Sequence, residues 1–266
     1  MSILTVFGIA GLVILGLMLL LWLLSLIIKD ASIVDIFWGT GFVISAWVYY
    51  FLTPDGLEAR KLLLVILVTI WGLRLSLHIA RRNLGKGEDY RYQKWRAENG
   101  KSWWYISFFK VFLLQGLLMW IIGLPLLAAQ YYPGSSQLIW LDWVAVVVWG
   151  VGFFFEAVGD WQLSRFLANP ANKGKLLTSG VWRYTRHPNY FGDATQWWAY
   201  YLFALATGSG WWTFISPLIM SLFLRYVSGV TMLEKELKIT KPGFAEYAET
   251  TNAFIPWFPK KRDKKG

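Results

Sequence analysis

Seven long apolar segments constrain this chain more than any other feature of its sequence. An α-helix rises about 1.5 Å per residue, so roughly 20 apolar residues cross the hydrocarbon core of a bilayer. The segments cover residues 3–28, 33–52, 62–80, 106–129, 138–159, 191–207 and 211–227. They predict an all-α polytopic membrane protein with seven transmembrane helices. The last two are short and closely spaced, so we expect them to form a hairpin or a partly re-entrant pair.

The composition fits a membrane setting and excludes several kinds of site. Hydrophobic residues make up 56% of the chain and charged residues 16%, while the 18 tryptophans suit aromatic belts at membrane surfaces. The net charge of +10 falls in loops and the tail, which indicates contact with acidic lipid headgroups rather than nucleic acid. Cysteine is absent and histidine occurs twice, so we expect no disulfide, no thiolate catalysis and no metal site.

The basic residues predict the orientation, because positive connectors stay on the cytoplasmic side. The connectors 81–101 and 165–186 and the tail 260–266 are strongly basic, whereas 130–137 and 208–210 carry no charge. This pattern places the N-terminus outside and the C-terminus in the cytoplasm. The one outer connector with basic residues is 53–61, and Asp55 and Glu58 share it.

The chain reads as one integral membrane domain over residues 1–266, because no internal repeat is present. Residues 3–28 have neither a basic stretch before them nor a clear cleavage site, so we expect a retained helix rather than a signal peptide. The basic tail 260–266 is predicted to be disordered.

Residues 180–193 concentrate charged and hydrogen-bonding side chains between two apolar segments, which makes them a candidate functional site. Pro188 suits the first turn of a helix, so we expect the sixth helix to begin there. Its free N–H groups would face Arg186 and its basic neighbours, a ready site for a phosphate. Asn189 and Asp193 are four residues apart and share a face. The alternative is loop charge that fixes orientation, together with a helix cap.

Further polar residues lie within the apolar segments. Glu156 and Asp160 share a helix face and could hold ligand hydroxyls or an amide, or could pair with Arg165 or Arg225. Arg225 ends the seventh segment at the predicted cytoplasmic face. Beyond it, Glu234 and Glu236 lie in an amphipathic stretch. We expect Glu236 to lie on the solvated face of a surface helix there.

Two helices carry candidates for contact with a substrate. Asp35 lies in the first turn of its helix, where an acid is favourable to the helix dipole, so a structural role and a catalytic role are both open. Arg74 and His78 share one face of the third helix. Arg74 should meet a carboxylate or a cavity, and His78 either packs at a helix interface or contacts ligand.

These residues resemble a known family. Segment 180–193, with 172–175 before it and 252–259 near the end, resembles the DUF1295 family of bacterial membrane proteins. That group is similar to the C-terminal domain of steroid 5α-reductases, the 3-oxo-5α-steroid 4-dehydrogenases. It more distantly resembles isoprenylcysteine carboxyl methyltransferases, which carry a similar Arg-His-Pro-x-Tyr element. The resemblance is specific over residues 156–259 and weaker around residues 35–38 and in the third helix.

The resemblance to the reductases implies a seven-helix fold with NADPH entering from the cytoplasm, and a cofactor-binding half over about residues 150–259. Lys175 matches a phosphate-contacting Arg, and Glu156 stands where the family can have an Asn. The residues that the resemblance assigns to the cofactor are Glu156, Asp160, Lys175, Tyr184, Arg186, His187, Asn189, Asp193 and Arg225.

The same resemblance implies hydride transfer to the β-carbon of an α,β-unsaturated ketone, with an acidic group polarising the carbonyl oxygen. The reductases use a Gln-Glu pair and a Tyr for this purpose. Here the pair reads Val34-Asp35, and Trp71 stands where the Tyr is expected. A protonated Asp35, alone or together with His78, is then the predicted donor, and the substrate need not be a steroid or a ketone.

Three functions stay open. The first is an NADPH-dependent reductase of an activated C=C bond in a steroid-like or other lipid that enters from the bilayer. The second is a methyltransferase that uses S-adenosylmethionine, which would explain Arg186, His187 and Glu234 without a phosphate. The third is a lipid-binding membrane protein without catalysis. We expect a multi-pass protein of the bacterial cytoplasmic membrane, and the sequence leaves its oligomeric state open.

Overall fold

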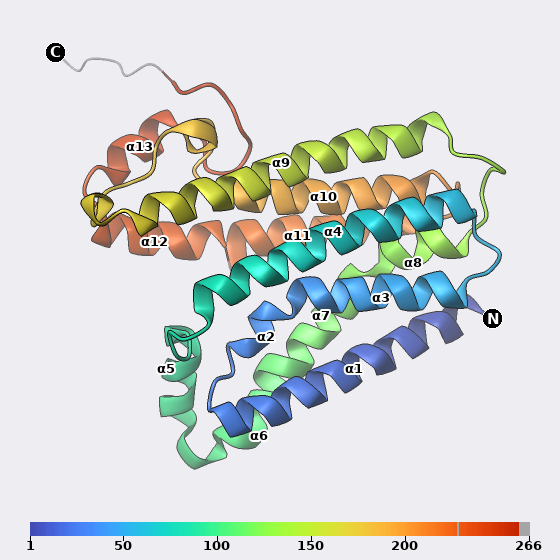
Figure 1. Ribbon diagram of the computed structural model, residues 1–266, viewed down its shortest axis with the longest axis horizontal. Helices are drawn as coiled ribbons and strands as arrows, with labels where there is room; N and C mark the ends of the chain where they lie inside the picture. Colours follow the sequence, from blue (N-terminus) through green and yellow to red (C-terminus); the bar gives the residue numbers. More distant parts are fainter. Residues whose placement is uncertain (228, 261–266) are drawn as a thin grey trace. The chain divides into compact units, whose positions relative to one another are not determined.

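The computed structural model describes residues 1–227 and 229–260, and every regular element in these residues is a helix (Figure 1). The all-α prediction is therefore confirmed for this part of the chain. Residues 261–266, most of the tail predicted to be disordered, lie outside the described residues. Five helical stretches are long and apolar enough to cross a membrane: α1 (Ile3–Ile28), α4 (Glu58–Asn83), the run Tyr90–Tyr131, α9 (Trp140–Ala168) and the run Trp211–Thr240.

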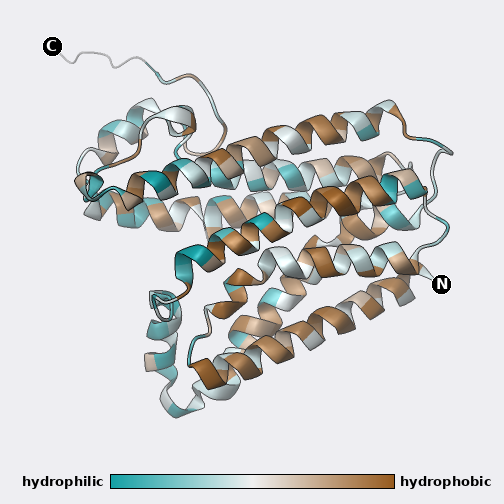
Figure 2. Ribbon diagram, in the orientation of Figure 1, coloured by the Kyte–Doolittle hydropathy of each residue, from teal (hydrophilic) through white to brown (hydrophobic). Residues whose placement is uncertain are grey.

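The other two predicted spans are not among these five stretches. Residues 33–52 form α2 (Ile33–Ile36) and α3 (Trp38–Leu52), with a break at Phe37. The 15 residues of α3 cover only about 22 Å. The sixth segment forms α10 (Pro188–Leu205), which begins at the proline as predicted but carries Asn189, Asp193 and Gln196. In Figure 2, α1 is coloured as apolar along most of its length, whereas α5 (Tyr90–Asn99) is largely polar.

The chain forms two compact units. Unit 1 contains Met1–Asp142 and Phe203–Ser216, and unit 2 contains Trp143–Leu202 and Pro217–Gly266. The other helical elements of unit 1 are η1 (Gly100–Ser102), α6 (Trp103–Ser107), the π-helix η2 (Phe108–Leu113), α7 (Leu114–Ile122), α8 (Leu124–Tyr131) and η5 (Trp211–Phe214). Those that follow α9 in unit 2 are η3 (Pro170–Asn172), η4 (Gly180–Arg183), the π-helix η6 (Phe223–Val227), α12 (Val230–Thr240) and α13 (Phe244–Thr250), and α11 (Ile215–Leu222) runs from unit 1 into unit 2.

In unit 1, α3 and α4 pack backbone against backbone. A Cβ atom on Gly39 would overlap the carbonyl oxygen of Gly72, and one on Gly72 would overlap that of Gly39. The N–H of Thr40 donates to Ser76 Oγ at 3.0 Å beside this contact. Small residues and hydroxyl groups are the usual means by which helices associate in a bilayer, where apolar side chains gain little by leaving lipid.

A buried ion pair fixes the other end of this unit. Arg60 Nε lies 2.6 Å from Asp142 Oδ1, and Arg60 Nη2 lies 2.9 Å from Asp142 Oδ2. Neither side chain is exposed. The N–H of Ile139 also donates to Asp142 Oδ2 at 2.9 Å. Because each charge has its partner and further hydrogen bonds, the pair can be tolerated away from water.

Candidate functional site

The candidate site of unit 2 is built where α9 and α10 touch. A Cβ atom on Gly192 would lie 2.5 Å from the backbone nitrogen of Glu156, and one on Gly152 would lie 2.7 Å from the carbonyl oxygen of Gly192. Two turns further along α9 from Gly152, a Cβ atom on Gly159 would lie 3.0 Å from Pro188. Only glycine permits so close an approach. The contact brings the acidic face of α9 against the first turns of α10.

Carboxylates and amides of the two helices meet at this crossing. Gln196 donates a hydrogen bond from Nε2 to Glu156 Oε2, and Asn189 donates from Nδ2 to Asp160 Oδ1 at 3.1 Å. Glu156 is 2% exposed, Asp160 6% and Asp193 9%. The helical spacing thus predicted correctly that Glu156 and Asp160 share a face. Three buried carboxylates on one helix pair are costly, so they mark a functional site more readily than a packing contact.

Gln196 adds a feature that the sequence did not single out. Its side chain is fully buried, and its Oε1 has no hydrogen-bond partner among the described residues. A buried acceptor that remains unpaired is unfavourable by about 1–3 kcal/mol. Since Gln196 already donates to Glu156, this oxygen suits an N–H group supplied by a ligand.

Arg186 and His187 converge on one acid. Arg186 Nε and Nη2 each lie 2.8 Å from Glu234 Oε1, and His187 Nε2 lies 3.2 Å from the same oxygen. Arg186 Nη1 also donates to the carbonyl oxygens of Ala248 and Thr251. The guanidinium therefore uses its N–H groups within unit 2, where it ties the start of α10 to α12 and to the C-terminal end of α13.

The remaining predicted residues of unit 2 lie nearer the surface. Lys175 is exposed in the loop before η4. Tyr184 is half-buried; its ring lies edge-on to Phe258, and its carbonyl accepts the N–H of Trp257 at 2.9 Å. Arg225 is exposed in the π-helical turn η6, with its guanidinium 5.2 Å from the ring centre of Tyr226.

A polar recess of about 340 Å³ lies at the C-terminal end of α9. It is lined by Trp161, Gln162, Arg165, Phe166, Asn169, Asn172, Leu177, Ser179 and Gly180. Arg165 lies over the Trp161 ring, 5.5 Å from its centre. Gln162 Oε1 accepts the N–H of Val181 at 3.1 Å and so holds the loop beside the helix. The lining contains a cation and several amides but no carboxylate, which suits an anion.

A second polar cluster lies in unit 1 around Asp35. Tyr92 donates its hydroxyl hydrogen to Asp35 Oδ1 at 2.8 Å, and Arg91 Nη2 lies 3.2 Å from Asp35 Oδ2. Gln115 donates from Nε2 to the Tyr92 oxygen at 3.2 Å and accepts the indole N–H of Trp38. Asp35 therefore has Arg91 and Tyr92 as partners, and His78 is half-buried on α4 with Arg74.

Tyr92 could not be predicted from the sequence, because it lies in a strongly basic connector and nothing in its neighbours indicates a contact with Asp35. Next to it, Asp89 caps α5 and accepts hydrogen bonds from the backbone N–H and from Nε of Arg91, at 3.0 and 2.8 Å. Burial alone would raise the pKa of Asp89, but these hydrogen bonds and the positive charge of Arg91 outweigh it. The pKa of this carboxyl lies below its usual value.

Comparisons with other proteins place the chain in a family. Residues 21–251 match the family described as "Protein of unknown function (DUF1295)". An uncharacterized protein of the fission yeast Schizosaccharomyces pombe is 26% identical in an alignment 266 positions long, which covers 89% of this chain and 75% of the yeast protein. No solved structure matches. Because the family match covers most of its length, the chain belongs to the DUF1295 family.

Proposed function

We propose that this chain is an NADPH-dependent membrane reductase that transfers a hydride to an activated C=C bond, of the enone type, in a steroid-like or other lipid substrate. The observation that carries the proposal is the α9–α10 crossing, where buried acids lie beside the unpaired Oε1 of Gln196. Carboxylates accept hydrogen bonds from ribose hydroxyls, and an amide oxygen accepts one from a carboxamide N–H. The similarity to steroid 5α-reductases that the sequence indicates supports the same choice.

Basic groups of unit 2 suit the phosphates of such a cofactor. Lys175 and Arg225 are exposed, and Arg165 lines the polar recess beside the loop that contains Lys175. Arg186 has a different part in this proposal, since its N–H groups are directed to Glu234 and to two carbonyl oxygens. Arg186 is a positioning residue that holds the first turn of α10. His187 Nε2 lies within hydrogen-bond distance of the same carboxylate, that of Glu234.

NADPH supplies the hydride in this chemistry, and the chain must supply the group that polarises the substrate. We assign that role to the hydroxyl of Tyr92, together with Asp35. Asp35 and Gln115 fix the Tyr92 oxygen from two sides. The Tyr92 hydroxyl would take the place of the tyrosine hydroxyl of the steroid 5α-reductases, because this chain has Trp71 where that tyrosine is expected. In this step a protonated Asp35 donates to the Tyr92 oxygen, which frees the Tyr92 hydroxyl hydrogen to donate to the enolate oxygen as negative charge develops on it.

The proposal includes seven membrane spans, an outer N-terminus and a cytoplasmic C-terminus. The outer connector 53–61 is the one that carries basic residues, and both are neutralised. Arg60 pairs with Asp142, while Lys61 Nζ lies 3.4 Å from Glu58 and 4.7 Å from the Tyr50 ring centre. This connector therefore adds no uncompensated positive charge outside. A bacterial cytoplasmic membrane as host stays a prediction, since the relative described above is a yeast protein.

Thermal unfolding of the detergent-purified chain with NADPH, NADH and S-adenosylmethionine in parallel tests the proposal. A ligand at 100 times its Kd stabilises the native state by about 2.7 kcal/mol. We expect the largest stabilisation from NADPH, its loss in Asp193→Asn, and its retention in Thr195→Val on the same helix. Equal NADPH stabilisation of both variants would refute the site assignment.

One observation favours a second candidate, a methyltransferase that uses S-adenosylmethionine. Arg186 and His187 are both paired with Glu234, so these two side chains do not need a phosphate as a partner. In that case S-adenosylmethionine alone would stabilise the protein in the same titration, and neither nicotinamide nucleotide would.

A further inference from the structure

Gln115 joins the indole of Trp38 to the hydroxyl of Tyr92. Its Oε1 accepts the indole N–H of Trp38, and its Nε2 donates to the Tyr92 oxygen at 3.2 Å. Trp38 begins α3, Tyr92 lies on α5 and Gln115 lies on α7, and all three helices belong to unit 1. One side-chain amide therefore links three helices beside the carboxyl group of Asp35.

The chemistry of the Trp38 indole determines which way this amide faces. An indole nitrogen only donates hydrogen bonds, whereas an amide has an accepting oxygen at one end and a donating nitrogen at the other. If the Gln115 amide were turned around, its NH2 group would face the Trp38 N–H, and that N–H would lose its acceptor. A donor without an acceptor is unfavourable where water is largely excluded. Trp38 therefore keeps the donating end of Gln115 directed at Tyr92.

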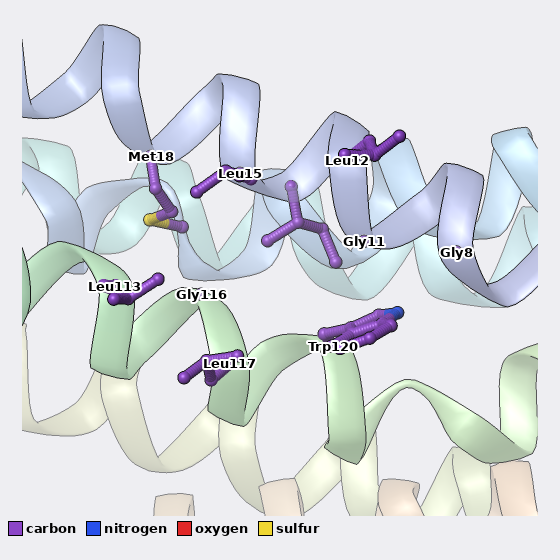
Figure 3. A pocket seen from close by; sticks show the side chains of 10 residues that line it. Gly8, Gly11, Leu12, Leu15, Met18, Leu113, Gly116, Leu117 and Trp120 are labelled. Atoms are coloured by element: carbon purple, nitrogen blue, oxygen red, sulfur yellow. The ribbon is translucent and has the colours of Figure 1, made fainter.

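The packing of α7 on α1 holds the backbone of Gln115 in place. A Cβ atom on Gly116 would lie 2.9 Å from Met18 of α1, and one on Gly11 of α1 would lie 2.7 Å from Trp120. Figure 3 shows Gly116 and Trp120 on the side of α7 that faces α1. Gln115 precedes Gly116 by one residue, so it projects about 100° around the helix from this contact. The contact with α1 thus fixes α7 and leaves the Gln115 side chain free to reach α3 and α5.

We propose that Trp38 and Gln115 are a positioning pair that keeps the Tyr92 hydroxyl a hydrogen-bond donor toward the substrate. This inference rests on the proposed reductase function, in which Tyr92 polarises the substrate. A phenol oxygen carries one hydrogen and can accept two hydrogen bonds. Gln115 occupies one accepting position, and Asp35, 2.8 Å away, occupies the other when it is protonated. The hydroxyl hydrogen is then left for the enolate oxygen, whereas an acceptor at position 115 would compete for it.

Gln115→Glu tests the pair, because the new side chain has the same shape and still offers an oxygen to Trp38. Its carboxylate can only accept from Tyr92, so the direction of that hydrogen bond is reversed. The assay is NADPH oxidation by the full-length chain in detergent, with progesterone as the probe enone. We expect kcat to fall about 100-fold at about pH 8. The matched control is Gln93→Glu, at an exposed glutamine next to Tyr92, which should keep the turnover of the wild type.

The pH profile separates positioning from structural damage. A protonated carboxyl group at position 115 can donate to Tyr92 again, so the ratio of variant to wild-type kcat should rise as the pH falls. A ratio that is the same at every pH would overturn the proposal. Circular dichroism establishes that the helices of each variant are intact. If Gln115→Glu does not fold, Trp38→Phe replaces it: it should lower kcat and leave the KM for NADPH unchanged, and a wild-type kcat would overturn the proposal.

Fluorine NMR distinguishes a failure of this inference from a failure of the reductase proposal. The full-length chain with Tyr92 replaced by 3-fluorotyrosine reports the hydrogen bonds of that hydroxyl without any turnover. The fluorine resonance should shift in Gln115→Glu and in Trp38→Phe, where the amide can turn around, and should not shift in Gln93→Glu. A resonance that stays unchanged in the first two variants would overturn the pair, whatever the turnover. If the wild type does not oxidise NADPH with progesterone, the reductase proposal fails, and the fluorine resonance still decides the direction of the hydrogen bond.

Discussion

The side chains of Arg60 and Asp142 form a two-point ion pair across 82 residues of sequence, and neither is exposed to solvent. Arg60 lies in the first turn of α4 and Asp142 in the first turn of α9. The pair therefore joins the first turns of α4 and α9, and both of its residues belong to unit 1. It also removes the charge of Arg60 from the connector in which the sequence places it.

Removing one partner of this pair should destabilise the protein strongly. Arg60→Met leaves the carboxylate of Asp142 buried without its counter-charge, which costs about 3–5 kcal/mol. Replacing both partners, as in Arg60→Met with Asp142→Leu, should recover much of the loss. Chemical unfolding in detergent measures both. If the double variant is no more stable than the single one, the cost arises from packing rather than from the unpaired charge.

The glycine contact of unit 2 should tolerate no added carbon. In Gly192→Ala the new Cβ atom would lie 2.5 Å from the Glu156 nitrogen, so α9 and α10 must separate. We expect a loss of about 1–3 kcal/mol in stability together with loss of NADPH binding. Gly150→Ala on α9 is the control, because a Cβ atom there meets nothing within 4 Å. Similar Tm values and NADPH affinities in the two variants would contradict this account of the crossing.

Loss of the Tyr92 hydroxyl should slow catalysis without weakening the binding of NADPH. Tyr92→Phe removes the group that donates to Asp35, and turnover should fall about 100-fold or more if that group acts as the acid. The assay is NADPH oxidation with progesterone as the probe enone, alongside an NADPH titration of stability. Tyr90→Phe, two residues away and exposed, is the matched control. Parallel turnover in the two variants would remove Tyr92 from the mechanism.

The contribution of Asp89 to stability should depend on pH in a defined direction. Its pKa is lower in the folded protein than in the unfolded chain, so its stabilising effect is present above the unfolded value of about 3.9 and is lost as the pH falls through the folded value. Asp89→Asn keeps a good helix cap but loses the charge. The Tm difference between wild type and Asp89→Asn should be constant from about pH 6 to 8. It should shrink as the pH falls below about 4. A Tm difference that persists in acid would mean that the Asp89 side chain stabilises the protein without its charge. Asp55→Asn, at an exposed aspartate, is the control.

Local patterns predicted much of the fold. The first apolar segment corresponds to α1 residue for residue, and Pro188 begins α10. The breaks at Phe37 and Gly123 were not predicted, because an apolar segment looks the same whether its helix is continuous or interrupted. These breaks depend on how neighbouring helices pack, which hydrophobic periodicity does not record.

The candidate site was predictable only where its residues are close in sequence. The four-residue spacing of Glu156 and Asp160 already indicates a common face. The partners Glu234 of Arg186 and Tyr92 of Asp35 are separated from them by 48 and 57 residues, so they required the tertiary structure. Gln196 was missed for another reason: its importance lies in an oxygen without a partner, and no pattern of residue types shows that.

The contact at Gly192 also links the two polar pairs of the crossing. Backbone rests on backbone there, and α9 further meets α10 where Gly152 faces Gln196 and where Gly159 faces Pro188. The pair Asn189–Asp160 and the pair Gln196–Glu156 lie along this same line of contact. A larger side chain at any one of the three glycines would therefore disturb both pairs at once.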